Sequence, residues 1–97
     1  MSKITKSAKG QQCQVRLPGI CNNNPETVVL AHYRMTGMCG IGIKPNDVLG
    51  AYACSACHDE VDRRTRILDA QEVRLYHAEG VFRTQSMLLD QHLIQVV

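Results

Sequence analysis

Residues 54–62 of the chain read CSACHDEVD, which places two cysteines, one histidine and three acidic residues within nine positions. The two cysteines, Cys54 and Cys57, have the C-x-x-C spacing that brings two thiolates to one side of a tight turn, and this spacing is typical of structural zinc sites. His58 follows the second cysteine directly. The stretch therefore predicts a metal-binding turn that continues into a helix with reactive side chains.

The other cysteines complete a predicted zinc site. Cys13 and Cys21 have seven residues between them, and the Pro18-Gly19 turn in this segment can fold it back so that both sulfurs point inward. Free cysteines often behave as small buried hydrophobic residues, an alternative that suits Cys39 best because it lies alone in a glycine-rich loop. We predict one structural zinc ion bound by Cys13, Cys21, Cys54 and Cys57.

Size and composition favour a structural metal. The chain has 97 residues, with four aromatic residues and no Trp, so a single domain spanning residues 1–97 has only a modest core. The odd number of cysteines, five, excludes a fully paired disulfide framework within one chain. The polar, basic N-terminus (MSKITKSAKGQQC) predicts neither a secretory signal nor a membrane span, which indicates a cytoplasmic protein.

The pattern of residues predicts a small α+β fold. Residues 26–33 (ETVVLAHY) are rich in β-branched and apolar residues and predict a strand, as do residues 48–54. Residues 35–47 hold three glycines and a proline, which indicates a loop. A helix is predicted from Ser55, stabilised by acid-to-base pairs four residues apart: Asp59 with Arg63, Glu60 with Arg64, and Asp62 with Arg66.

A long C-terminal helix is predicted over residues 69–92. Asp69 and Glu72 form a capping pattern at its start, and Gly80 costs it about 1 kcal/mol relative to Ala. His77 and His92 are best interpreted as ordinary core or surface residues of this helix. Its predicted apolar face consists of Val73, Tyr76, Phe82, Leu88 and Leu89.

The basic residues are concentrated in the first half of the chain. Residues 1–46 carry six Lys or Arg against one acid, whereas residues 47–97 carry five against eight. Residues 1–9 are predicted to form a flexible basic arm. The basic half can face nucleic acid, or its lysines can belong simply to a solvated terminus, and the sequence leaves both interpretations open.

Two histidines are candidates for catalysis. His58 begins the first helical turn after the metal-binding turn, which would hold it rigidly, and His32 ends the first predicted strand. If the two strands pair, both histidines can flank one phosphate. The alternatives are a fifth zinc ligand or a polar helix start for His58, and an unpartnered polar residue at the strand end for His32.

The order of these motifs resembles the HNH (ββα-metal, His-Me finger) endonucleases. The resemblance rests on Cys13 and Cys21, then 30-LAHYR-34, then 54-CSACHDEVD-62. More narrowly, CQVRLPGIC, LAHYR, MTGMCGIG and CSACHDEVDRRT resemble the YbcO-like family of lambdoid phages and prophages, proteins regarded as nucleases. This narrower resemblance extends from about residue 9 into the long helix, and it implies a small zinc-stabilised HNH-like domain in the cytoplasm of a bacterial host.

The HNH resemblance implies roles for individual residues. It implies His32 as general base and His58 as ligand of a catalytic divalent ion, while the four cysteines bind structural zinc. Two positions depart from the HNH pattern: Ala31 stands where a metal-binding acid or histidine is usual, and the usual Asn of the second strand has no counterpart. Asp62, one turn after His58, can replace the missing ligand, although an ion pair with Arg66 is its alternative role.

The expected function is metal-dependent hydrolysis of phosphodiester bonds in DNA. Neutral His32 would accept a proton from water, and Mg²⁺, Mn²⁺ or another transition metal ion such as Ni²⁺ would act at His58. Arg34, Lys44 and Arg63 are the expected phosphate contacts. Expected partners are DNA and phage recombination or replication proteins, with no membrane. The alternative function is a catalytically inactive zinc-knuckle module that binds DNA or protein.

Overall fold

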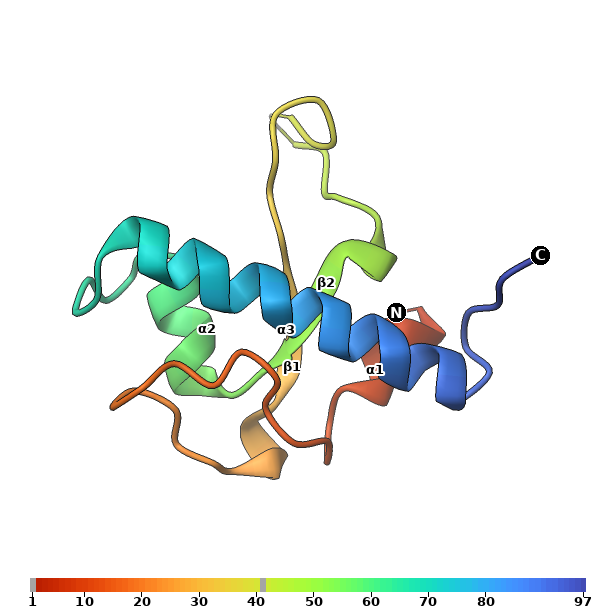
Figure 1. Ribbon diagram of the computed structural model, residues 1–97, viewed down its shortest axis with the longest axis horizontal. Coiled ribbons are helices and arrows are strands. Elements are labelled where there is room, and N and C mark those ends of the chain that lie inside the picture. Colours follow the sequence, from red (N-terminus) through yellow and green to blue (C-terminus); the bar gives the residue numbers. More distant parts are fainter. Residues whose placement is uncertain (1, 41) are drawn as a thin grey trace.

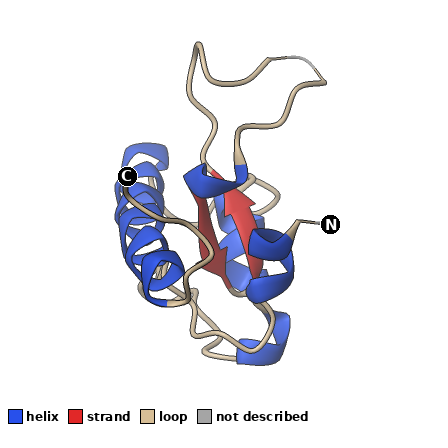
Figure 2. Ribbon diagram, turned by 90° about the vertical axis from the view of Figure 1, so that its right-hand side faces the viewer, coloured by secondary structure: helices blue, strands red, loops and turns tan. Residues whose placement is uncertain are grey.

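The computed structural model describes residues 2–40 and 42–97 and has an α+β architecture built on one antiparallel strand pair (Figure 1). Figure 2 shows the sheet between the long helix on one side and the N-terminal helix on the other. The elements in chain order are α1 (Lys3–Ser7), the 3-10 helix η1 (Pro25–Thr27), β1 (Val29–His32), the 3-10 helix η2 (Asp47–Leu49), β2 (Gly50–Ala53), α2 (Ser55–Val61) and α3 (Ala70–Asp90).

The strands are shorter than the sequence predicted. Each is preceded by a 3-10 turn that takes up the first residues of the predicted strand, because an asparagine side chain caps the turn. The Asn24 side chain accepts a hydrogen bond from the Glu26 amide (3.1 Å), and the Asn46 side chain accepts one from the Val48 amide (3.0 Å). The strands pair with His32 opposite Gly50, so the end of β1 lies beside the start of β2.

Helix α2 ends at Val61, and its predicted acid-to-base pairs are wrong. Arg63 has a φ of 60°, a left-handed conformation that stops the helix, so Arg63, Arg64 and Arg66 lie beyond its last turn. Arg64 pairs instead with Asp59, at 3.2 Å. The turn that follows is therefore stabilised by other contacts than those expected.

The buried carboxylate of Glu60 organises the turn between α2 and α3. It accepts hydrogen bonds from the Thr65 hydroxyl (2.5 Å) and from the amides of Ile67 (2.9 Å) and Leu68 (2.7 Å). Burial alone raises the pKa of the Glu60 carboxyl, but these hydrogen bonds and nearby Arg63 outweigh that effect and lower its pKa below the ordinary value. Glu60 thus acts as an anion that holds the turn.

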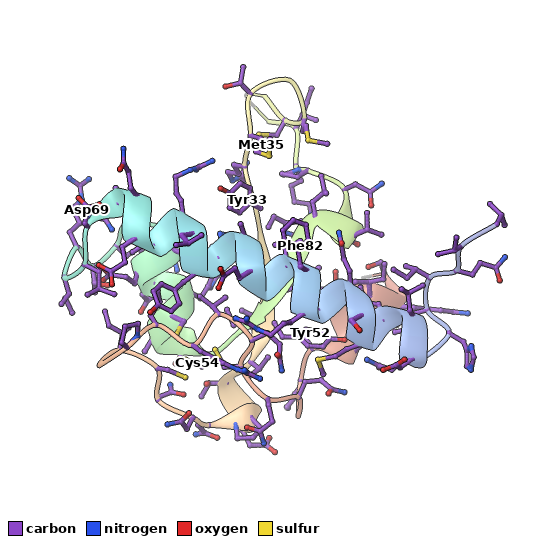
Figure 3. The ribbon with its side chains drawn as sticks, in the orientation of Figure 1. Tyr33, Met35, Tyr52, Cys54, Asp69 and Phe82 are labelled. Carbon is purple, nitrogen blue, oxygen red and sulfur yellow. The ribbon has the colours of Figure 1, made fainter. Side chains whose placement is uncertain are left out.

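The predicted start of α3 is confirmed, but its predicted apolar face is partly wrong. The Asp69 side chain accepts hydrogen bonds from the amides of Gln71 (3.0 Å) and Glu72 (3.4 Å). Phe82 is 68% exposed and Leu89 38% exposed, because they lie outside the stripe of helical positions that faces the sheet. The buried residues of α3 are Val73, His77, Gly80, Val81, Thr84 and Leu88. Figure 3 shows Phe82 on the same side of α3 as Tyr33 and Met35.

Gly80 allows the chain segment that carries Cys13 to pack closely on α3. A Cβ atom at this position would lie 3.0 Å from the Gln14 carbonyl oxygen and 3.1 Å from the Val15 Cα. Arg83, one turn later, donates hydrogen bonds to the same Gln14 oxygen at 3.2 and 2.6 Å. The helix-weakening glycine therefore has a packing role that its position in the sequence did not reveal.

The N-terminal segment, predicted as a flexible arm, contains helix α1 and contacts the rest of the protein. Ser2 caps α1, Ala8 is buried, and the Ser7 hydroxyl hydrogen-bonds the Tyr52 hydroxyl at 2.7 Å. The lysines of the segment, Lys3, Lys6 and Lys9, are exposed. Two of these three charges, Lys3 and Lys6, are thus displayed on helix α1.

The predicted glycine-rich loop joins β1 to η2 and projects from the body of the molecule (Figure 2). Within its described residues, Cys39 contacts the Met35 carbonyl oxygen through its sulfur, at 3.6 Å. None of the helices formed by residues 2–40 and 42–97 combines the length and apolar character that crossing a membrane requires.

Candidate metal centre and histidine cavity

Four cysteines converge at the N-terminal end of α2. Their sulfur atoms all lie within 4.8 Å of one another, and the four residues are Cys13, Cys21, Cys54 and Cys57, the set that the sequence predicted. Cys54 and Cys57 are fully buried, Cys13 is 7% exposed and Cys21 is half-buried. Figure 3 places Cys54 at the base of α2.

Local backbone hydrogen bonds direct the sulfurs toward one another. The Cys54 sulfur accepts hydrogen bonds from the amides of Cys57 and Asn22, both at 3.4 Å, so it caps α2 and ties it to the neighbouring loop. On that loop, the amides of Ile20 and Cys21 donate to the Leu17 carbonyl at 3.2 and 3.0 Å. This is the turn that the Pro-Gly pair predicted, and it brings Cys21 back toward Cys13.

The cluster has the dimensions and donors of a metal site. Zn–S bonds of about 2.3 Å in a tetrahedron give sulfur separations of about 3.8 Å, and the Cys21 and Cys54 sulfurs lie 3.9 Å apart. The hydrogen bond from Cys57 lowers the pKa of the Cys13 thiol to about 4, whereas burial raises the pKa of Cys21 to about 11. A bound cation would stabilise the Cys21 thiolate against this rise, and a four-sulfur donor set suits zinc.

A second, polar site lies near the C-terminal end of α2. It is a cavity of about 80 Å³ lined by His32, Arg34, Val61, Asp62, Val73, Arg74 and His77. The His32 residue in this lining lies at the end of β1, and Asp62 lies at the C-terminal end of α2. The pairing of β1 with β2, which leads directly into α2, brings these two elements together.

His58 joins this site through Asp62. The His58 Nε2 atom lies 3.1 Å from an Asp62 carboxylate oxygen, so the two side chains share one face of α2 as predicted. Asp62 also contacts Arg64 at 3.6 Å, and the expected alternative, a pair with Arg66, is not what the structure has. The His58 and Asp62 side chains are 28% and 36% exposed and remain accessible to a ligand.

The Ala31 side chain cannot bind a metal ion, but the Ala31 backbone positions His77, which lines the cavity. The Ala31 carbonyl oxygen lies 2.8 Å from Nε2 of His77, whose ring packs against Tyr33 with centroids 4.9 Å apart. Burial lowers the pKa of His77, so this histidine is neutral at physiological pH and donates its proton to the carbonyl. His77 is thus a core residue of α3, as interpreted from the sequence.

Two residues of the site, Asp47 and Arg74, were not predicted from the sequence. An Asp47 carboxylate oxygen lies 2.8 Å from Nε2 of His32. The Arg74 guanidinium stacks over the Tyr33 ring at 4.6 Å, donates to the Arg34 carbonyl oxygen at 3.5 Å and lines the cavity. The Asn-Asp pair at residues 46–47 is a capping signal that could have placed Asp47 at the start of a turn. The contact between Asp47 and His32 and the contacts of Arg74 cannot be predicted from neighbouring residues, however.

The predicted phosphate contacts lie in different environments. Arg34 lines the cavity, and Lys44 is exposed on the projecting loop. Arg63 instead donates to the Leu68 carbonyl oxygen at 3.2 Å and pairs with Glu60 at 3.6 Å. The Arg63 guanidinium is therefore engaged in the turn between α2 and α3, where it serves the fold.

Similarity to known proteins identifies the family of this chain. The pattern of the family described as "Putative nuclease YbcO" matches residues 2–92. The chain belongs to the YbcO family. Two YbcO relatives, both named putative nucleases, come from Escherichia coli K12 and from enterobacteria phage 82; each is 53% identical over 95 residues, covering 98% of this chain and 99% of the relative.

A different protein of known structure has the same fold as this YbcO-family chain. It is described as a putative bacteriophage protein from Escherichia coli K-12 and superposes with a TM-score of 0.80 at 49% identity, covering 92% of this chain and 99% of the other. The resemblance to the YbcO family inferred from the sequence is therefore confirmed.

Proposed function

We propose that the protein is a metal-dependent DNA endonuclease of the HNH type. The observation that carries the proposal is the polar cavity, which is lined by His32 at the end of β1 and by Asp62 directly after α2, with the His58 Nε2 atom 3.1 Å from the Asp62 carboxylate. Two arginines, Arg34 and Arg74, line the same cavity and provide positive charge for a phosphate. The nuclease names of the two relatives support a nucleic-acid substrate.

In this proposal His32 is the general base. Imidazole suits the removal of a proton from water near neutral pH, because histidine changes its charge in that range. His32 is half-buried at the strand end, with its ring at the wall of the cavity. A water molecule between His32 and the scissile phosphate would lose its proton to the ring as its oxygen attacks phosphorus.

His58 and Asp62 are the proposed ligands of the catalytic ion. Two neighbouring ligands of an octahedral ion with bonds of about 2.1 Å lie about 3.0 Å apart, and the His58 nitrogen and Asp62 oxygen are separated by 3.1 Å. Asp62 would thus supply the ligand that Ala31 cannot. When bound, a divalent ion would neutralise charge on the phosphate and on the leaving oxygen; a histidine ligand favours Mn²⁺ or Ni²⁺ beside Mg²⁺.

The four-cysteine cluster would position this site without taking part in the reaction. Cys57 directly precedes His58 on α2, so a structural zinc ion held by the cluster would fix the first turn of the helix and thereby the direction of His58. Zinc would therefore affect catalysis only through geometry.

DNA binding in this proposal uses cations around the cavity. Arg34 and Arg74 would contact the scissile phosphate, and Lys44 on the projecting loop would contact a neighbouring phosphate. Such contacts predict salt-dependent binding with little sequence preference.

The proposal is tested by incubating supercoiled, linear and branched DNA with the purified protein and Mg²⁺, Mn²⁺ or Ni²⁺. His32→Ala is expected to lower the cleavage rate by about 10²- to 10⁴-fold, the contribution typical of a general base, while the protein stays folded and its zinc content is unchanged. His92→Asn, at an exposed histidine after α3, is the matched control and should retain full activity.

Two results would contradict the nuclease proposal. The first is no cleavage with any of the three ions while salt-sensitive DNA binding persists, which would identify a DNA-binding module. The second is cleavage that His32→Ala leaves intact, which would assign the activity to another site or to a contaminant.

A further inference from the structure

The candidate base, His32, is held from outside the cavity by a carboxylate. The His32 Nε2 atom lies 2.8 Å from Oδ1 of Asp47, and the two side chains are only 14% and 25% exposed. Asp47 lies at the start of η2, fifteen residues further along the chain, and the Asn46 cap fixes the backbone there. The contact therefore joins the end of β1 to the turn that precedes β2.

The second oxygen of the same carboxylate is bound by helix α1. The Ser2 hydroxyl donates to Asp47 Oδ2, and the Thr5 hydroxyl contacts that oxygen at 3.4 Å. Ser2 is itself fixed, because its side-chain oxygen caps α1 by accepting a hydrogen bond from the Thr5 amide at 3.1 Å. Asp47 thus bridges a histidine on one side and the ordered N-terminal helix on the other.

These contacts determine which nitrogen of His32 carries the proton. The Ser2 hydrogen bond, followed by the hydrogen bond to His32, lowers the pKa of Asp47, so the carboxylate is ionised near neutral pH. An ionised carboxylate can only accept hydrogen bonds, so Nε2 of His32 must be the donor. In the neutral ring the other nitrogen, Nδ1, is then unprotonated and free to accept a proton.

We propose that Asp47 is a positioning residue that holds His32 in the tautomer with the proton on Nε2, and that α1 fixes Asp47 through Ser2 and Thr5. The inference rests on the proposed function, because it assigns His32 Nδ1 as the atom that takes the proton from water. The Asp47 carboxylate then stabilises the positively charged ring that forms. The N-terminal helix becomes part of the catalytic apparatus although it lies outside the cavity.

The test is nitrogen NMR on protein labelled with ¹⁵N-histidine, with the His32 signals assigned by their absence in His32→Gln. At a pH where the ring is neutral, the wild type is expected to show a protonated Nε2 and an unprotonated Nδ1. Asp47→Ala should move the two His32 nitrogen shifts toward each other as the tautomers mix. DNA cleavage by this variant should fall by about 10- to 100-fold, as for other groups that orient catalytic ligands.

Control variants separate positioning from folding. Asp90→Ala removes an exposed acid at the end of α3 and should change neither the tautomer nor the cleavage rate. The double variant Ser2→Ala/Thr5→Val removes both α1 contacts to Asp47 and should shift the His32 signals in the same direction as Asp47→Ala, by less; Lys3→Ala is its control on the same helix. This pair decides the question if Asp47→Ala fails to fold.

The proposal is overturned if wild-type His32 carries its proton on Nδ1, or if its spectrum is unchanged in folded Asp47→Ala. It is also overturned if the variant loses activity only in proportion to a loss of zinc or of folded protein. A wild-type protein that cleaves no DNA defeats the proposed nuclease function, but the NMR measurement still tests whether Asp47 sets the tautomer.

Discussion

The two ends of helix α2 differ although only seven residues form it. At its N-terminal end, Cys54 and Cys57 are fully buried, and their sulfurs face two further sulfurs. Toward its C-terminal end, the His58 and Asp62 side chains are 28% and 36% exposed, and Asp62 lines a polar cavity. A buried group of potential metal ligands, the cysteines, and a partly exposed group, His58 and Asp62, thus lie within about two turns of the same helix.

This difference indicates how a small protein can separate stability from reactivity. Structural metal sites are enclosed by protein ligands, whereas catalytic sites keep positions open for water and substrate. Because α2 connects both sites rigidly, order at the cysteine end is transmitted to the histidine end. The comparison predicts that substitutions at the two ends have separable effects on folding and on activity.

The largest effect is expected at the closed end. Cys57→Ser removes one of four converging sulfurs and should abolish stoichiometric zinc binding and most of the folded population, because binding of a structural zinc contributes about 10 kcal/mol or more to folding in small zinc domains. Zinc analysis and circular dichroism measure both losses. Cys39→Ser, outside the cluster, is the control and should retain zinc; a folded, zinc-free Cys57→Ser protein would show that the cluster is not structural.

At the open end the effect should fall on metal-dependent activity alone. Asp62→Ala should raise the divalent-ion concentration needed for cleavage by about 10- to 100-fold without changing zinc content or Tm. The control is Asp59→Ala on the same helix, whose carboxylate pairs with Arg64. Equal metal requirements in Asp62→Ala and wild type would remove Asp62 from the ion site.

Glu60 lies between the two ends in sequence but points into the protein, and its substitution should affect stability. Glu60→Gln loses the charge that three hydrogen bonds stabilise and should lower the Tm by about 5–10 °C near neutral pH.

The pH dependence of the Glu60 effect has a definite sign. Since the pKa of Glu60 is lowered from its ordinary 4.5, the stabilisation is fully present above pH 4.5 and is lost as the pH falls through the lowered value. Thermal melts of both proteins should therefore converge in acid. A difference in Tm that grows on acidification would contradict this role.

The smallest effect is expected at Gly80, which supports the closed end from α3. Gly80→Ala gains about 1 kcal/mol of helix propensity, but its Cβ would press on the Gln14 and Val15 backbone, and such overpacking costs about 1–3 kcal/mol. We expect a net loss of up to about 2 kcal/mol in urea unfolding, with Glu79→Ala, an exposed neighbour, within about 0.5 kcal/mol of wild type. A stabilised Gly80→Ala would mean that the cysteine loop yields easily.

The features that could be predicted from the sequence are those encoded by short spacings. The C-x-x-C pair, the Pro-Gly turn and the Asp69 cap each depend on neighbouring residues, and the structure places all of them as predicted. The joint position of His58 and Asp62 follows from helix geometry in the same way.

The features that were missed depend on contacts between distant residues. Asp47 meets His32 only because the long loop folds back, and it meets Ser2 across 45 positions. Helix α2 ends early because the Glu60 carboxylate accepts hydrogen bonds from the amides of Ile67 and Leu68, which a longer helix would prevent. The spacing of charged residues does not reveal these contacts. The exposure of Phe82 was missed because hydrophobicity alone does not specify which stripe of a helix is buried.

Tyr52 lies on the outer edge of β2, one of the two strands in the sheet formed by residues 2–40 and 42–97. Its amide is hydrogen-bonded to the Thr84 hydroxyl at 3.0 Å, and its carbonyl accepts a hydrogen bond from the Gln14 amide at 2.7 Å. Unpaired strand edges are templates on which further strands of other molecules can add, which leads to aggregation. A helix side chain and a loop amide therefore occupy, at Tyr52, the two backbone groups that an added strand would need on this edge.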